Sequence, residues 1–190
     1  MNLLVLASTS FEVEPFTNSF PQADLCITGV GAVHATYALL HKLREKKYDA
    51  VIQCGIAGVF NNRFALGETV WVERDCFADL GVNEKQSFQT IYQLDLADAN
   101  KFPYTNGWLV NPHSLLHSHS HSAASAITVN MLTEDNQLIQ RMYANGQPQI
   151  ETMEGAAVHY VCLMENIPFL QIRGISNQVG AVSYTHLRAH

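Results

Sequence analysis

Short apolar runs alternate with segments of helical periodicity along most of the chain. The apolar runs predict buried strands at residues 3–8, 24–31, 49–58, 67–75, 127–132, 149–153 and 168–176. Apolar residues at every third or fourth position predict helices at 32–47, 133–145 and 154–166, with Thr133 as the N-cap of the second. The strand at 49–58 is expected to break into a glycine-rich turn. This alternation is typical of a layered α/β domain with a largely parallel sheet.

Residues 76–125 give no clear element. They contain scattered aromatic residues, Pro103, Pro112 and the run HSLLHSHSHS at 113–122. We favour a polar loop there over a metal site, because no acidic residue or cysteine accompanies the histidines. Long loops in compact domains often form lids or subunit contacts.

Composition narrows the class of protein. The 190 residues are 47% apolar, which fits one globular domain, and 11 basic against 17 acidic side chains give a formal charge of −6. There is no Lys/Arg-rich run, which argues against a nucleic acid or an anionic membrane as partner. The cysteines show no metal or disulfide spacing, which is typical of thiols in a reducing compartment: Cys26, Cys54, Cys76 and Cys162. We expect a cytoplasmic protein, since MNLLVLAS lacks a basic start and is too short to span a membrane.

The last ten residues differ from the rest. AVSYTHLRAH resembles the translated read-through of a sequencing adapter. We therefore expect one domain over residues 1–180 and a non-native tail over 181–190. Without Arg188 the balance is 10 basic against 17 acidic side chains, or −7, so the conclusion from charge is unchanged.

Polar residues and glycines follow the predicted strands at their carboxyl ends, where open α/β sheets bind ligands. In chain order they are Ser8, Thr9 and Glu12, then Gly29 to Gly31, Gly55 to Gly58, Met153 to Ala157, and Ser176 with Asn177. Each glycine segment alone fits an ordinary turn, and Glu12 fits an acid at a helix N-terminus. Glu154 carries a stronger signal, because it precedes Gly-Ala-Ala at the positive end of a helix. A carboxylate there can accept hydrogen bonds from a vicinal diol such as ribose.

The segment ETMEGAAVHYVCLMENIPFLQIRGISN, residues 151–177, resembles the signature of the nucleoside phosphorylase and hydrolase superfamily. The TGVG and CGIAG segments follow in the order and spacing of that superfamily. The resemblance implies a three-layer α-β-α sandwich around a mixed, mostly parallel twisted sheet, here without its C-terminal helix. Within the superfamily, ITVNML and the segments of 151–177 are most similar to the futalosine hydrolases of menaquinone biosynthesis.

The resemblance also implies roles for single residues. Glu154 would bind the ribose hydroxyls, with Met153 against the sugar and Gly31 near the nucleophile. Glu12 would activate water, with Glu14 as an alternative, because this stretch aligns with the family only to within a residue or two. The remaining candidates would line or read the base: Ala57, Gly58, Ser176 and Asn177.

Two features bear on the reaction. Adenosine-cleaving relatives carry Asp where this chain has Asn177, and an amide NH2 suits a 6-oxopurine. The family's phosphorylases place an arginine before the third-strand glycines, where this chain has Gln53 and Cys54. Water is therefore the expected nucleophile, and the resemblance implies no metal or cofactor, a nucleoside as the small-molecule partner, and a homo-oligomer. The alternatives are another nucleosidase or phosphorylase of this fold, and a non-catalytic nucleoside-binding protein.

Overall fold

The computed structural model describes residues 1–14, 22–84, 87–112, 121–144 and 146–180. The expected tail at 181–190 and most of the His/Ser run, 113–120, lie outside these residues. The strands are β1 (Leu3–Ala7), β2 (Asp24–Ile27), β3 (Ala50–Val59), β4 (Thr69–Asp75), β5 (Gly81–Glu84), β6 (Ser87–Thr90), β7 (Tyr104–Thr105), β8 (Trp108–Val110), β9 (Ser122–Thr128), β10 (Ile150–Thr152) and β11 (Phe169–Gln178). The helices are η1 (Ser10–Glu12), α2 (Ala32–Glu45), α3 (Asn136–Ala144) and α4 (Gly155–Met164).

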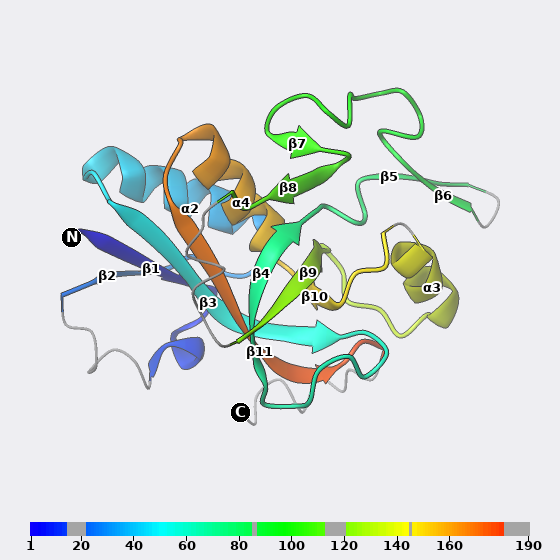
Figure 1. The fold of residues 1–190 in the computed structure, drawn as a ribbon, viewed down its shortest axis with the longest axis horizontal. Helices are drawn as coiled ribbons and strands as arrows, with labels where there is room; N and C mark the ends of the chain where they lie inside the picture. The colour runs from blue at the N-terminus through cyan, green and yellow to red at the C-terminus, as the bar shows by residue number, and fades with distance from the viewer. Residues whose placement is uncertain (15–21, 85–86, 113–120, 145, 181–190) are drawn as a thin grey trace.

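One mixed sheet organises the domain (Figure 1). Its strand order is β2-β1-β3-β10-β9-β4-β8-β7, and β11 pairs with both β3 and β4. Because of these two pairings, strands β3, β10, β9, β4 and β11 close into a ring. The expected α/β class with a mixed sheet is confirmed, and the ring adds a barrel-like half to it.

Helices cover both faces of the sheet. Helices α2 and α4 lie side by side and pack on an apolar cluster that includes Leu4, Leu39 and Val51. Helix α3 packs on a different cluster, formed with Phe60, Ile127 and neighbouring residues. The inside of the ring is filled by small and branched side chains, Ala57, Val59, Val70, Val72, Ala124, Ala126, Ile150 and Ile175 among them. Three layers therefore form, as expected.

Several sequence-based boundaries were wrong. The expected turn at Gly55 to Gly58 is extended strand, because β3 continues to Val59 and pairs with β11 along its length. The strand expected at 127–132 is β9, which begins earlier and ends at Thr128. There the chain leaves the sheet, and Asn130 N–H donates to Asp79 Oδ2 at 2.6 Å.

Two local predictions also failed. Asp135, not Thr133, caps α3, since its Oδ1 accepts from the Gln137 N–H at 2.9 Å, while the Thr133 hydroxyl accepts from Asp135 N–H. Residues 76–112, which showed no clear pattern, contain the β5–β6 and β7–β8 hairpins. Their short strands leave too few alternating positions to show a period.

Candidate functional site

The loop after β2 reaches the head of α4. Gly29 and Gly31 have φ of +81° and +98°, which only glycine adopts without strain, so the turn expected here is confirmed. The Gly31 N–H donates to Glu154 Oε1 at 2.8 Å. Glu154 is 5% exposed and is the N-cap residue of α4. Gly31 and Glu154 are 123 positions apart, and the sequence analysis placed both at the carboxyl edge of the sheet. The structure shows them in direct contact.

The glycine after Glu154 lets a buried acid approach the start of α4. A Cβ at Gly155 would overlap Asp75 Oδ2 and the Gln171 amide. Asp75 is fully buried, and its desolvation raises the pKa of the carboxyl group to about 7. The position therefore requires glycine because of close packing.

Two threonines connect Asp75 to the helix. The Ala156 N–H donates to Thr128 Oγ1 at 2.7 Å, and Thr128 Oγ1 donates to Asp75 Oδ1 at 3.0 Å. Thr152 Oγ1 lies 3.1 Å from the Thr128 hydroxyl and accepts from the Gly155 N–H. Two of the first N–H groups of α4 are thereby satisfied from inside the protein, which fixes the helix end that carries Glu154.

Buried polar residues of β11 extend this network. Arg173 is 1% exposed, and its guanidinium donates to the Gln171 amide oxygen and to the Ile56 carbonyl. The Gln171 amide nitrogen lies 2.7 Å from His159 Nε2, and His159 Nδ1 lies 3.1 Å from the Leu109 carbonyl. Burial lowers the pKa of His159 to about 4, so the ring is neutral and donates from Nδ1 to Leu109. These contacts give Arg173 a structural role between β11 and β3.

The carboxylate of Glu12 lies against β3. Its Oε2 accepts from the Thr9 N–H at 2.7 Å and from the Thr9 hydroxyl at 3.1 Å, as in a capping box. Its Oε1 accepts a long hydrogen bond, 3.4 Å, from the Ile56 N–H. Glu14 is exposed on the same turn.

The glycines of β3 leave room for functional side chains on both faces of the strand. A Cβ at Gly55 would overlap the Arg173 guanidinium and lie 2.8 Å from Glu12 Oε1. A Cβ at Gly58 would lie 3.3 Å from Asn177 Nδ2. The CGIAG segment thus serves close approach rather than a turn, and it brings Glu12, Arg173 and Asn177 to one strand.

A β-bulge orients Asn177. The register between β3 and β11 shifts between Ile175, which pairs with Ala57, and Asn177, which pairs with Gly58. The extra residue, Ser176, donates to the Ala57 carbonyl at 3.3 Å and to Asn177 Oδ1 at 2.7 Å. Without the bulge, Asn177 would face the inside of the ring beside Ile175, since side chains alternate along a strand.

The predicted residues therefore fall into two groups joined by β3. Glu154, Gly31 and Met153 lie at the head of α4, and Ser176 and Asn177 lie against Ala57 and Gly58. Met153 is half-buried beside Glu154. Glu12 lies between the groups, against Gly55 and Ile56.

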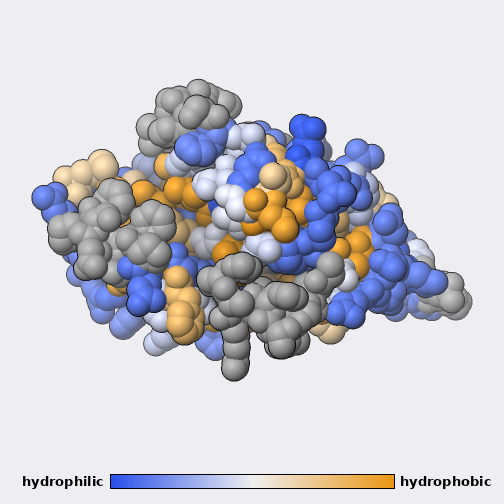
Figure 2. All heavy atoms as spheres, turned by 90° about the horizontal axis from the view of Figure 1, so that it is seen from below, coloured by the Kyte–Doolittle hydropathy of each residue, from blue (hydrophilic) through white to orange (hydrophobic). Residues whose placement is uncertain are grey.

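The surface near these groups carries apolar side chains. Figure 2 shows hydrophobic patches among hydrophilic residues on the face seen from below Figure 1. Three apolar side chains adjoin candidate site residues in the sequence and are exposed: Phe11 at 76%, Val30 at 50% and Ile56 at 39%.

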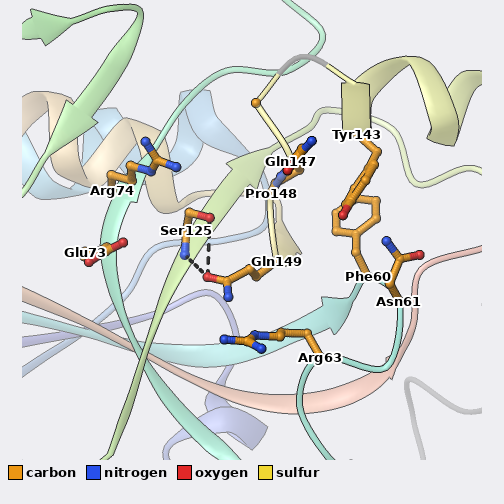
Figure 3. A pocket seen from close by; sticks show the side chains of 11 residues that line it. Phe60, Asn61, Arg63, Glu73, Arg74, Ser125, Tyr143, Gln147, Pro148 and Gln149 are labelled. Carbon is orange, nitrogen blue, oxygen red and sulfur yellow. Dashed lines mark hydrogen bonds between the residues drawn. The ribbon is translucent and has the colours of Figure 1, made fainter.

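A separate cavity of about 390 Å³ lies elsewhere on the domain (Figure 3). Its lining includes Arg63, Arg74, Ser125 and Gln149, and Gln149 Oε1 accepts from Ser125 N–H at 2.9 Å. None of the residues predicted from the sequence as site residues lines it. Among the described residues, no group of three His, Cys, Asp or Glu side chains could hold a metal ion.

Sequence reasoning missed the residues behind the site. Asp75, Thr128 and Gln171 contact the head of α4 or its supports. Thr128 and Gln171 are single polar residues in apolar runs, and Asp75 ends the charged run 73–75 of a strand. Their buried polarity within strand patterns was the available signal, since such groups need partners. Glu151, buried on β10, was missed in the same way.

Comparisons with known proteins agree with this arrangement. A family model described as "Phosphorylase superfamily" matches residues 21–188. Futalosine hydrolase of Thermus thermophilus is 27% identical over 164 residues, which cover 85% of this chain and 72% of that protein.

Solved structures share the fold. The native structure of futalosine hydrolase of Helicobacter pylori has a TM-score of 0.81 at 13% identity and covers 100% of this chain and 90% of that one. A D198N mutant of H. pylori MTAN with 5'-methylthioadenosine in the active site has a TM-score of 0.81 at 13% identity, covering 99% and 90%. The 5'-methylthioadenosine/S-adenosylhomocysteine nucleosidase of S. pneumoniae has a TM-score of 0.77 at 16% identity, covering 94% and 86%.

Proposed function

The chain belongs to the phosphorylase superfamily, and from this premise we propose that it is a purine-nucleoside N-ribosyl hydrolase that acts on futalosine. The products are hypoxanthine and dehypoxanthine futalosine, in menaquinone biosynthesis. The observation that carries the proposal is the buried Glu154 carboxylate at the head of α4, whose Oε1 accepts from the Gly31 N–H. The relative named futalosine hydrolase supports the choice of substrate.

Glu154 binds the ribose hydroxyls in this proposal. One oxygen, Oε1, is held by Gly31, and among the described residues Oε2 receives no hydrogen bond. A carboxylate accepts charge-assisted hydrogen bonds from a diol, and the positive end of α4 favours its ionised form. Met153, half-buried beside it, packs against the sugar.

Glu12 acts as the general base toward water. Thr9 holds Oε2 in place, which leaves Oε1 as the oxygen nearer the Ile56 N–H and Gly55. A base must be held within hydrogen-bond reach of the proton that it takes, and capping by Thr9 restricts the side chain in this way. The exposure of Glu14 supports Glu12 over its neighbour.

Asn177, which lies next to Ala57, Gly58 and Ser176, recognises the purine base and stabilises it as it leaves. As the C–N bond lengthens, the sugar gains oxocarbenium character and negative charge develops on the purine. The Asn177 amide donates to the oxygen or nitrogen on which that charge develops. Its Nδ2 donates to the Gln178 carbonyl at 2.9 Å in this structure, so one N–H remains for a base.

The placement of arginine supports water over phosphate as nucleophile. A phosphorylase holds phosphate with arginines and backbone amides. Arg173 is buried and its guanidinium is used by Gln171 and Ile56. Arg63 lines the separate cavity of Figure 3.

The test is a turnover assay with futalosine, inosine and methylthioadenosine, each with and without phosphate. We expect futalosine to be cleaved fastest, in phosphate-free buffer, with release of a reducing sugar. A phosphate-dependent sugar-1-phosphate product would make the protein a phosphorylase. Preference for methylthioadenosine would assign it a different substrate, and binding without turnover would make it a nucleoside-binding protein.

The proposal includes a homo-oligomer. Helix α2 exposes Val33 by 78% and Tyr37 by 72%, apolar surface that a second subunit would cover. Light scattering on the purified protein tests this, and a monomer at assay concentration contradicts it. Among the described residues, no helix is long and apolar enough to cross a membrane.

A further inference from the structure

The separate cavity of Figure 3 is built from residues that strand pairing brings together. Arg74 of β4 pairs with Ser125 of β9. The Ser125 carbonyl accepts from the Gln149 N–H at 2.8 Å, and the Gln149 carbonyl accepts from the Phe60 N–H at 2.9 Å. The backbone beneath the cavity is therefore a hydrogen-bonded row, and the cavity is preformed, as small-molecule sites usually are.

A buried serine orients the side-chain amide of Gln149. Ser125 is 4% exposed, and Gln149 Oε1 accepts from its N–H at 2.9 Å and from its hydroxyl at 3.4 Å. Both hydrogen bonds go to the amide oxygen, and among the described residues the Gln149 Nε2 donates to no other group. The Gln149 amide therefore offers a hydrogen-bond donor at the cavity.

Two arginines lie on either side of the Ser125–Gln149 pair. Figure 3 shows Arg74 above the pair and Arg63 below it. Within the described ranges of the chain, neither guanidinium forms an ion pair. The Arg74 Cζ lies 4.2 Å from the centroid of the Trp108 ring, and its Nε is buried without a hydrogen-bond partner. Because a buried donor without a partner is costly, the pair of arginines indicates a site for an anion.

The charge at the cavity differs in sign from that of the whole chain. The protein has a formal charge of −6. The charged residues that line the cavity are Arg63, Arg74 and Glu73, which leaves one excess positive charge. Glu73 is exposed and, in the part of the chain that the structure describes, forms no ion pair with either arginine. The two guanidiniums are therefore available to a ligand.

Aromatic side chains form the wall of the cavity across from Arg74. The ring centroids of Phe60 and Tyr143 are 5.7 Å apart, and Figure 3 shows both rings on the side away from Arg74. Phe60 is 4% exposed and belongs to the apolar cluster under α3, which holds this wall in place. A flat ring can pack against such a wall while its charged group faces the arginines.

We propose that this cavity is a second binding site, which takes a small aromatic carboxylate. The guanidiniums of Arg63 and Arg74 and the amide of Gln149 supply the donors, and planar guanidiniums match the geometry of a carboxylate. The ring of the ligand packs against Phe60 and Tyr143. The volume of about 390 Å³ lies within the range of small-molecule sites. The proposal goes beyond nucleoside hydrolysis and does not depend on it.

Calorimetry on the full chain tests the class of ligand with three probes. 1-Naphthoate carries a flat ring and a charge, 1-naphthalenemethanol carries the ring alone, and inorganic phosphate carries the charge alone. We expect 1-naphthoate to bind about tenfold or more tightly than either of the others, because only it uses both the arginines and the aromatic wall. No binding of 1-naphthoate, or equal binding of the alcohol, overturns the proposal. Tighter binding of phosphate also overturns it, since the site would then take an inorganic anion.

Three variants test whether the probe binds in this cavity. Arg63→Gln and Glu73→Gln change exposed side chains, so the fold should persist, and a thermal melt checks this. Arg63→Gln should weaken the binding of 1-naphthoate about tenfold, and Glu73→Gln should tighten it by removing a carboxylate that repels the ligand. Arg44→Gln, at an exposed position in the last turn of α2, is the matched control and should leave the affinity unchanged. Unchanged affinity in a folded Arg63→Gln protein, or an equal loss in Arg44→Gln, overturns the proposal.

Discussion

Glu154 Oε1 accepts a hydrogen bond of 2.8 Å from the backbone N–H of Gly31. The contact joins the head of α4 to the loop after β2, and it depends on a glycine with φ of +98°. At the start of the helix, Thr128 and Thr152 accept from its first N–H groups, and Asp75 accepts from the Thr128 hydroxyl. The loop after β2 thus holds the Glu154 carboxylate, and a buried network holds the start of the helix that carries it.

The first prediction concerns Glu154. Glu154→Gln retains an oxygen that can accept from Gly31 N–H, so the fold should persist, but it weakens acceptance from two ribose hydroxyls. Each charge-assisted bond contributes about 1.5–3 kcal/mol, so both KM and kcat for futalosine should deteriorate. Steady-state kinetics with a thermal melt as control check this. Near-normal kinetics in the variant would mean that Glu154 does not hold the sugar.

The second prediction separates Glu12 from Glu14. In Glu12→Gln the amide oxygen can still accept a hydrogen bond from the Thr9 N–H, so the melting temperature should change little. It removes the base, and kcat should fall by about two to four orders of magnitude with a small change in KM. Glu14→Gln is the matched control. Loss of activity in Glu14→Gln, with Glu12→Gln active, would transfer the role of base to Glu14.

The third prediction concerns Asn177. Asn177→Asp places a carboxylate before the oxygen of a 6-oxopurine and across Gly58 from Glu151. The two acids should repel each other and the O6 atom, so activity on futalosine should fall relative to its 6-amino analogue. The measurement is kcat/KM for both substrates in both proteins. An unchanged ratio would show that position 177 does not read the base.

Much of this arrangement was visible in the sequence, because it rests on short-range patterns. Strands β1 to β4 and β9 to β11, the three helices and the glycine turn at 29–31 follow from periodicity and from the conformational freedom of glycine. The rule that the carboxyl ends of parallel strands share one edge of the sheet placed Glu154 and Gly31 near each other, and the structure adds the contact between them. The family was confirmed by comparison.

The features that could not be predicted depend on the register between paired strands and on the closure of the ring of strands. The bulge at Ser176 decides which face Asn177 occupies, and nothing in QIRGISN marks it. The ring of strands makes Gly55 to Gly58 a strand, because β11 supplies partners that a local pattern cannot reveal. Asp75 and Glu151 become neighbours of the site only through pairings between strands distant in sequence.

The fourth prediction concerns stability and pH. Glu151 has a folded pKa of about 7 against an ordinary value of 4.5, so the folded state binds its proton more tightly. The stability linked to that proton is complete below about pH 4.5 and is lost as pH rises through 7. Glu151→Gln removes this loss, so its advantage over wild type should grow between pH 4.5 and 7.5 to on the order of 3 kcal/mol.

Urea unfolding at several pH values measures this difference. Asp75, also with a pKa of about 7, acts in the same direction, while His159, with a pKa of about 4, gains stability as pH rises from 4 to 6.5. Both are present in either protein and cancel in the comparison. Asp79 remains beside position 151 in both. A difference that is constant across the range would show that Glu151 is not desolvated.

The fifth prediction tests the support behind α4 with two glycines. A Cβ at Gly155 would overlap the Asp75 carboxylate, which is buried and hydrogen-bonded to Thr128. Gly155→Ala should therefore lower the free energy of unfolding by about 1–3 kcal/mol through overpacking. It should also lower kcat, because the head of α4 carries Glu154. Gly174→Ala is the control, since a Cβ there meets no atom within 4 Å, and it should change stability by less than about 1 kcal/mol. Equal melting temperatures and rates for both variants would mean that the head of α4 adjusts freely, and that the Asp75 network does not position Glu154.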